Sequence, residues 1–91
     1  MAAAARLGDK CTGHPKCPPR PNDEGSGNVY VNNLPAHRQG DHWTIHCLHD
    51  SVLAVGSSTV YINNKGAGRI GDPVACGSAV AEGSSNVFIG G

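Results

Sequence analysis

The sequence predicts a small all-β fold of three β-hairpin repeats, arranged with approximate threefold symmetry around a metal site and with little or no helix. Three observations predict it: a threefold internal repeat, short segments in which β-branched and aromatic residues alternate, and metal-ligand residue types at repeat-equivalent positions. We assign the chain to a single domain, 1–91, with repeats at roughly 4–35, 36–66 and 67–91.

The first repeated motif is Arg-x-Gly-Asp. It occurs at 6–9, 38–41 and 69–72, at intervals of 32 and 31 residues. Glycine permits a tight turn, and aspartate accepts backbone hydrogen bonds there. We expect each arginine to pair with a carboxylate between repeats, so the motif is predicted to be structural.

The second repeated motif is Gly-Ser followed by a short apolar run, at 25–32, 56–63 and 83–90. Alternation of β-branched and aromatic residues predicts strands with Tyr30, Tyr61 and Phe88 on one face and the valines and isoleucines on the other. Because further apolar residues precede the second and third copies, we expect the Gly-Ser elements to be hairpin turns. No long stretch repeats apolar residues at helical spacing, so no helix is expected.

The first repeat departs from this pattern at residues 15–23, where four prolines cannot donate ladder hydrogen bonds. Two interpretations stay open for this segment. It forms an ordered or semi-rigid loop, with polyproline character, or a flexible surface loop.

The composition excludes several classes of protein. Seven basic and seven acidic residues cancel, which argues against a nucleic-acid partner. The opening residues lack the pattern of a signal peptide, and no window approaches the roughly 20 apolar residues of a membrane span, so we expect a soluble product made in the cytoplasm. Thirteen glycines, one tryptophan and one phenylalanine leave little for a core, which favours stabilisation by a metal.

Metal-ligand residue types recur after each Gly-Asp. His14 lies five residues after the first aspartate, His46 five after the second and Cys76 four after the third. Approximate threefold rotation brings equivalent positions together at the common axis. We choose His49 as the fourth ligand, since it follows His46 by three residues and completes a His3Cys set suited to tetrahedral zinc.

Other residues compete for the fourth position. Cys47 is adjacent to His46 and points elsewhere if that stretch is extended, and His42 lies directly behind Asp41. For Cys11 and Cys17, a local disulfide, a role as a ligand and a buried thiol all stay open. Buried thiols are favoured because the expected compartment is reducing.

The sequence does not favour an enzyme. A catalytic zinc keeps one position open for water, whereas four protein ligands close the site. Glu24 and Glu82 are the only glutamates and neither adjoins a ligand. No catalytic residues are assigned, and zinc is expected to be a structural cofactor.

Residues 35–38, Pro-Ala-His-Arg, are similar to the Pro-Ala-Ala-Arg signature of the PAAR-repeat family, and 4–9 and 66–72 resemble its other copies. The resemblance implies a β-rich cone that caps the trimeric β-helical spike of a contractile injection machine, with a His3Cys zinc near its apex. It also implies a monomer docked on a trimer, a VgrG-like spike of a type VI secretion system, and transient contact with a target membrane. His37 replaces an alanine of the signature, and the third copy reads Gly-Ala-Gly-Arg.

The predicted function is therefore a structural, membrane-piercing spike tip, assembled in the bacterial cytoplasm and ejected on the spike. One alternative is the tip of a phage or prophage tail spike. A further alternative is a stand-alone zinc-binding interaction module. No effector domain is expected after Gly91, although residues 18–27 are considered as a site for effector cargo or a chaperone.

Overall fold

The computed structural model describes residues 1–13, 18–46 and 49–90, without the side chains of residues 45, 46, 49 and 50. The described residues form only short antiparallel strand pairs and no helix, which confirms the predicted all-β class. No helix in them is long and apolar enough to cross a membrane. The strands are β1 (Ala2–Ala3), β2 (Tyr30–Val31), β3 (Leu34–Pro35), β4 (His42–His46), β5 (His49–Val52), β6 (Tyr61–Ile62), β7 (Lys65–Gly66) and β8 (Phe88–Ile89).

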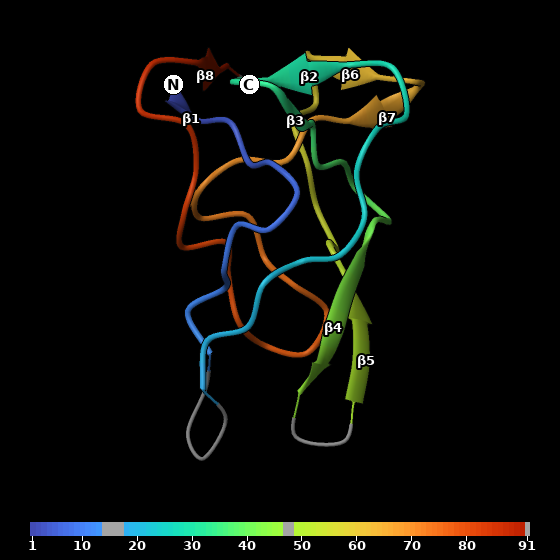
Figure 1. Cartoon of the computed structure of the whole chain (residues 1–91), viewed down its shortest axis with the longest axis vertical. Coiled ribbons are helices and arrows are strands. Elements are labelled where there is room, and N and C mark those ends of the chain that lie inside the picture. Colours follow the sequence, from blue (N-terminus) through green and yellow to red (C-terminus); the bar gives the residue numbers. More distant parts are fainter. Residues whose placement is uncertain (14–17, 47–48, 91) are drawn as a thin grey trace.

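The strand pairs give the molecule two different ends. The pairs β2–β3, β6–β7 and β1–β8 lie together at one end of the long axis, which we call the hairpin end (Figure 1). The β4–β5 pair runs toward the opposite end, which we call the loop end. The principal extents are 32 × 24 × 21 Å, so the molecule is longer than it is wide.

Each of the first two hairpins turns at an Asn-Asn pair. Asn32 and Asn33 have φ values of 53° and 66°, and Asn63 and Asn64 have 54° and 67°. A two-residue type I′ hairpin turn needs positive φ at both central residues, which asparagine tolerates better than most side chains. The prediction that the Gly-Ser elements are the hairpin turns is therefore wrong.

The Gly-Ser elements instead start each hairpin and hold it against the next repeat. The hydroxyl of Ser26 accepts hydrogen bonds from the amides of Asn28 and Val29, at 3.2 and 2.9 Å. Ser57 and Ser84 do the same in their repeats. The preceding glycine lies against backbone: a Cβ on Gly83 would stand 2.8 Å from the carbonyl oxygen of Ala4. A side chain there would separate the two segments.

The third hairpin joins the two ends of the described chain. In β1–β8, Ala2 pairs with Ile89 and Ala3 pairs with Phe88. The pairing matches that of β2–β3 and β6–β7, except that no turn connects the strands. The predicted set of three hairpin repeats is thus confirmed, with the third one divided between the N-terminal and C-terminal segments.

A ring of three backbone hydrogen bonds joins the repeats at their common axis. The amide of Ala5 donates to the carbonyl of Gly68 at 2.9 Å, that of Gly68 to His37 at 2.8 Å, and that of His37 to Ala5 at 3.1 Å. These residues hold the same position in the three copies of the repeat. The approximate threefold symmetry read from the sequence is therefore present in the backbone.

The Arg-x-Gly-Asp motif forms an ion pair inside each repeat. Arg38 donates from Nε and Nη2 to the two carboxylate oxygens of Asp41, at 2.8 and 2.9 Å, and Arg6–Asp9 and Arg69–Asp72 are equivalent. The intervening glycine turns the chain with φ near +90°, as in Gly40 at 89°. The predicted pairing between repeats is wrong, because an aspartate three residues away already satisfies the planar guanidinium fork.

The arginines reach the neighbouring repeat through a different acceptor. Nη1 of Arg38 donates to the side-chain oxygen of Asn63 at 2.9 Å, and the Ser26 hydroxyl donates to the same oxygen at 2.6 Å. Arg6 and Ser84 share Asn32 in the same way. The hairpin-turn asparagines thus connect successive repeats.

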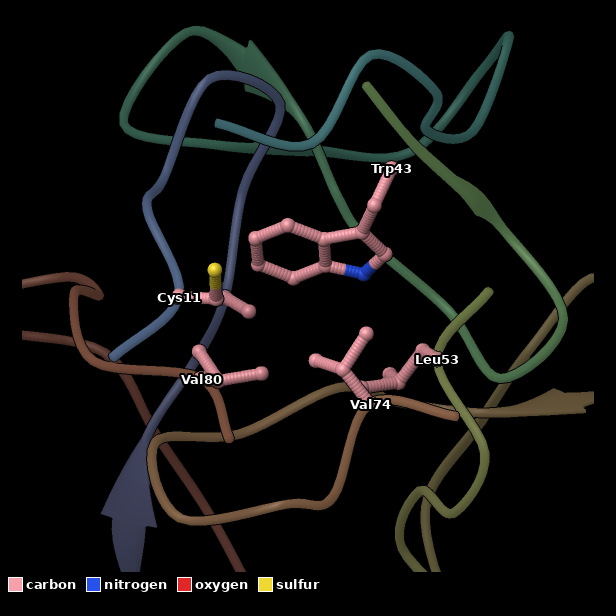
Figure 2. Packing of buried hydrophobic residues seen from close by; sticks show 6 residues of the cluster. Cys11, Trp43, Leu53, Val74 and Val80 are labelled. Carbon is pink, nitrogen blue, oxygen red and sulfur yellow. The ribbon is translucent and has the colours of Figure 1, made fainter. Parts of the chain in front are cut away.

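Two small apolar clusters make up the described core. One is centred on Trp43, which is 2% exposed (Figure 2). Its other members are Ala5, Cys11, Leu53, Val74 and Val80. The second cluster, under the hairpins, contains Ala4, Val31 and Ala36, against which Ile62, Val87 and Ile89 pack.

The second cluster confirms the predicted strand faces. Val31, Ile62 and Ile89 pack inward, whereas Tyr30, Tyr61 and Phe88 are 57%, 60% and 51% exposed. Because alternate residues of a strand point to opposite faces, one buried set leaves the other in solvent. The hairpin end therefore carries one exposed aromatic ring from each repeat.

The end of the proline-rich segment is ordered by backbone pairing. The amide of Cys11 donates to the carbonyl of Arg20 at 2.9 Å, and Pro21 and Asn22 form bridges with Lys10 and Trp43. The ordered alternative is confirmed there, whereas residues 15–17 lie outside the described residues. Cys11 is 1% exposed, as expected, and Cys17 is outside the description.

Asn22 replaces an apolar residue of the other repeats. Its amide donates to the carbonyl of Asp9, as those of Leu53 and Val80 do to Asp41 and Asp72. Its side chain accepts from the amide of Gly8 at 3.1 Å and donates to the carbonyl of Arg6 at 2.8 Å. At 2% exposure, the amide group satisfies backbone atoms that water does not reach.

Candidate metal centre

Two chain segments come together near the loop end. One is the β4–β5 pair, and the other is the turn of residues 73–79 (Figure 1). The amide of Ala75 donates to the carbonyl of Val52 at 2.9 Å, and the amide of Cys76 donates to the Ser51 hydroxyl at 2.9 Å. The turn is therefore fixed to β5 by consecutive hydrogen bonds.

The register of β4–β5 places two histidines opposite one another. His42 pairs with Val52 and Trp43 with Ser51, and after an irregularity His46 pairs with His49. Directly opposed residues in an antiparallel pair have Cα atoms roughly 4.5–5.5 Å apart. Two residues that are three apart in the sequence are thus neighbours across the ladder.

The turn that carries Cys76 is closed by its own backbone. Pro73 and Ala79 form a bridge, and the amide of Val74 donates to the carbonyl of Ser78 at 2.8 Å. Gly77 takes a φ of +104°, which disfavours any residue with a side chain. Cys76, within this turn, is only partly buried.

Hydroxyl groups surround the Cys76 sulfur. The Ser78 Oγ lies 3.3 Å from Sγ. Burial alone raises the pKa of the Cys76 thiol, but hydrogen bonds from the side chains of Ser78 and Ser51 and from backbone amides lower it overall. Because the thiolate is the form that binds metals, this environment favours a ligand role for Cys76.

Comparison with known families decides which family this fold belongs to. The PAAR motif family model matches residues 13–82, which is more than half of the chain. The chain belongs to the PAAR-motif family. A search of curated proteins found none that matches it.

Membership in the PAAR family supports a role as a spike-tip protein of contractile injection machinery. The family is structural and not enzymatic, its members bind a metal, and it implies association with a spike protein in a secretion or phage machine.

Only some of the predicted ligands belong to the part of the chain that the structure describes. His14 and the alternative Cys47 lie outside the described residues. The backbones of His46 and His49 are paired, but their side chains are not described. Cys76 is fully described. Among the side chains that are described, no three of His, Cys, Asp and Glu gather closely enough to hold a metal ion, so the His3Cys set stays a prediction.

His42 has a different environment from the other candidate ligands. Its Nδ1 lies 2.7 Å from Oδ1 of Asp23, and its amide donates to Oε1 of Glu24 at 2.8 Å. It begins β4 four residues before His46, about 13 Å away along an extended strand. This distance favours His49 over His42 as the partner of His46.

His37 is the residue at which the chain departs from the PAAR signature, and it lies on the threefold axis. Its repeat-equivalents are the small residues Ala5 and Gly68, and its ring is 0% exposed. A Cβ on Gly68 would stand 2.8 Å from Cδ2 of Leu53 and 3.0 Å from the carbonyl oxygen of His37. The missing side chain of Gly68 therefore lets Leu53 and the His37 backbone pack closely at the axis.

The His37 ring is held mainly by one polar contact. Nδ1 lies 2.7 Å from the carbonyl oxygen of Glu24, and the ring meets Trp43 edge-on at a centroid distance of 5.3 Å. Nε2 has no hydrogen-bond partner among the described residues. Burial lowers the pKa of His37 despite the nearby Asp41 and Glu24 carboxylates.

Sequence analysis missed Ser51 and Ser78 as part of this site. Each lies two residues from a predicted ligand, Ser51 after His49 and Ser78 after Cys76. That spacing was visible, but serine is common in turns, so spacing alone carried no signal. The contact of Ser51 with Cys76 appears only when the 73–79 turn is placed against β5, and that of Ser78 only when the turn itself has formed.

Proposed function

We propose that this protein is the membrane-piercing tip that caps the trimeric spike of a type VI secretion system, with a structural zinc ion bracing its loop end. One observation carries the proposal: the hydrogen-bond ring of Ala5, His37 and Gly68 gives a single chain a threefold axis. A chain with that symmetry presents three similar surfaces to the three equivalent subunits at the end of a trimer.

The hairpin end supplies the docking face in this proposal. Tyr30, Tyr61 and Phe88 are exposed at equivalent places in the three repeats, so each faces one spike subunit. Exposed aromatic side chains are typical anchors of protein interfaces, because they bury much apolar area with few rotatable bonds. The loop end then points away from the spike.

The proposed metal ligands are His14, His46, His49 and Cys76. Three of them belong to one hydrogen-bonded unit, since His46 is paired with His49 and the turn of Cys76 is bonded to β5. The donor chemistry fits zinc, which binds imidazole nitrogen and thiolate sulfur in tetrahedral sites. In this proposal His14 completes the set from the segment that follows Cys11. The backbone of Cys11 itself pairs with Arg20 and Val80.

A metal at this end has a mechanical purpose. The described core residues lie around Trp43 and under the hairpins, and few large apolar residues are available elsewhere in the chain. Structural zinc contributes about 10–16 kcal/mol of binding free energy in zinc-finger peptides, which would stabilise a narrow point without a hydrophobic core. Such a point would stay folded as the spike drives it through a membrane.

The docking proposal is tested by mixing the purified protein with a candidate trimeric spike and separating the products by size-exclusion chromatography. We expect one tip per spike trimer. Tyr61→Asp should weaken the complex at least tenfold, about 1.4 kcal/mol, whereas Val55→Asp, at a residue that is 46% exposed outside the hairpins, should not. Absence of a complex with any secretion spike, together with binding to a phage central spike, would favour the phage alternative.

A further inference from the structure

The surroundings of Cys76 contain two buried hydroxyl groups that no ligand assignment uses. Ser51 is 8% exposed and Ser78 is 5% exposed. Ser78 Oγ lies 3.3 Å from the cysteine sulfur, and Ser51 Oγ accepts the hydrogen bond from the Cys76 amide at 2.9 Å. One serine therefore contacts the sulfur, and the other holds the backbone that carries it.

Both serines lie on rigid elements. Ser51 is paired in β4–β5 with Trp43, the largest buried side chain of the core. The carbonyl of Ser78 closes the 73–79 turn by accepting from Val74 at 2.8 Å. The strand pair and the turn therefore fix the backbone of both serines beside Cys76.

The chemistry of a metal-bound cysteine assigns the direction of these hydrogen bonds. A metal-bound thiolate has no proton, so between Ser78 and the sulfur only the hydroxyl can donate. The Ser51 oxygen accepts from the Cys76 amide, which leaves its own proton available to an acceptor. Groups that hydrogen-bond a metal ligand fix its direction, and their removal costs roughly 10–100-fold in metal affinity.

We propose that Ser51 and Ser78 are positioning residues of the metal centre: Ser78 donates to the Cys76 sulfur and stabilises its negative charge, and Ser51 holds the Cys76 amide so that the sulfur is directed toward the ion. This inference rests on the metal site proposed above. The Ser78 hydroxyl has no part in closing the turn, which is held by backbone bonds that an alanine would keep. The Ser51 hydroxyl also helps to fix the turn to β5, through the Cys76 amide.

The test compares Ser78→Ala and Ser51→Ala with Ser78→Thr, which retains the hydroxyl. Zinc affinity is measured by competition with a chromogenic chelator, and the sulfur-to-cobalt charge-transfer band is recorded for the Co²⁺-substituted protein. The alanine variants should bind zinc about 10–100-fold more weakly with a shifted band, and Ser78→Thr should restore both. A purely structural role would lower the melting temperature without moving the band.

Ser26→Ala is the matched control, since Ser26 is equally buried and hydrogen-bonded but lies at the hairpin end. It should leave zinc affinity and the cobalt band unchanged. If both alanine variants keep wild-type affinity and band position, the inference is wrong even though the metal site stands. If the wild-type protein binds no zinc or cobalt, the proposed metal site itself is wrong. Should Ser51→Ala fail to fold, the Ser78 pair of variants decides alone.

Discussion

In the third repeat, the carbonyl oxygen of Gly90 accepts the hydrogen bonds that the side-chain oxygen of Asn63 accepts in the second repeat. Asn63 accepts from Arg38 and Ser26, and Gly90 accepts from Arg69 at 3.3 Å and Ser57 at 2.7 Å. A backbone atom thus replaces a side chain at the same point of the symmetric network. The acceptor is retained because a buried serine and an arginine both need it.

Removal of this acceptor should destabilise the hairpin end. Asn63→Gly keeps the positive φ of the turn but leaves Arg38 and Ser26 without their shared acceptor, so we expect a loss of about 1–3 kcal/mol in the free energy of unfolding. Asn64→Gly, next in the same turn, should change it by less than about 0.5 kcal/mol. Equal effects in urea denaturation would show that turn conformation, and not the acceptor, matters.

Asn22 should contribute to stability through both atoms of its amide. Asn22→Ala leaves the amide of Gly8 and the carbonyl of Arg6 without this partner, and we expect a loss of about 1–3 kcal/mol. Asn22→Asp keeps the acceptor for Gly8 but loses the donor to the carbonyls of Arg6 and Asp9 and adds a buried negative charge, so it should be at least as destabilising as the alanine variant. Chemical denaturation measures both. An alanine variant as stable as the wild type would contradict the prediction.

The protein should lose stability in mild acid because of His37. Burial lowers the folded-state pKa of His37, whereas the unfolded chain takes up a proton near pH 6.5, its ordinary value. The folded state therefore binds fewer protons, and stability falls as the pH drops through about 6.5 toward the folded pKa. The slope from one such proton is at most about 1.4 kcal/mol per pH unit.

The variant that checks this is His37→Ala, which has the residue found at the equivalent position in the first repeat, Ala5. Its unfolding free energy should depend less on pH between about 7.5 and 5 than that of the wild type. Both are measured with excess chelator, so that protonation of metal ligands does not enter the comparison. Identical slopes would mean that His37 does not titrate differently in the two states.

Metal removal should lower the melting temperature of the protein, and this decrease should require Cys76. Zinc at a thousand times its dissociation constant adds about 4 kcal/mol of stability, which corresponds to about 16 °C or more in melting temperature for a domain of this size. Chelator should therefore lower the melting temperature of the wild type but not that of Cys76→Ser.

His42→Ala should keep its zinc, and His49→Ala should lose it. The opposite result for the two histidines would make His42 the fourth ligand.

The parts of the fold that sequence predicted are those set by periodicity. The inward Val31 and outward Tyr30 follow from strand alternation, and the threefold arrangement follows from the recurrence of Arg-x-Gly-Asp. The turn position was missed because Gly-Ser and Asn-Asn are both turn signals, and only the pairing of β2 with β3 distinguishes them. Arg38 was paired with the wrong repeat because charge type does not reveal the nearer partner.

The proposed metal site could be predicted only as a set of residue types. Spacing from the Gly-Asp turns predicted His46 and Cys76 as ligands, but it did not reveal that β5 contacts the turn of Cys76 through Ser51. The contact of Ser51 with Cys76 and the burial of His37 depend on how the repeats pack, which involves contacts between residues far apart in the chain. Such contacts have no local sequence signature.

The division of the third hairpin between β1 and β8 has a consequence for how the chain folds. During synthesis, Ala2–Ala3 must stay unpaired until Phe88–Ile89 are made, and the axis ring likewise waits for Gly68. Contacts between distant segments form slowly because the loop between them must close first. Closure of β1–β8 is thus a late step in folding, and hydrogen exchange at Ala3 and Phe88 would show whether the same pair is the first to open.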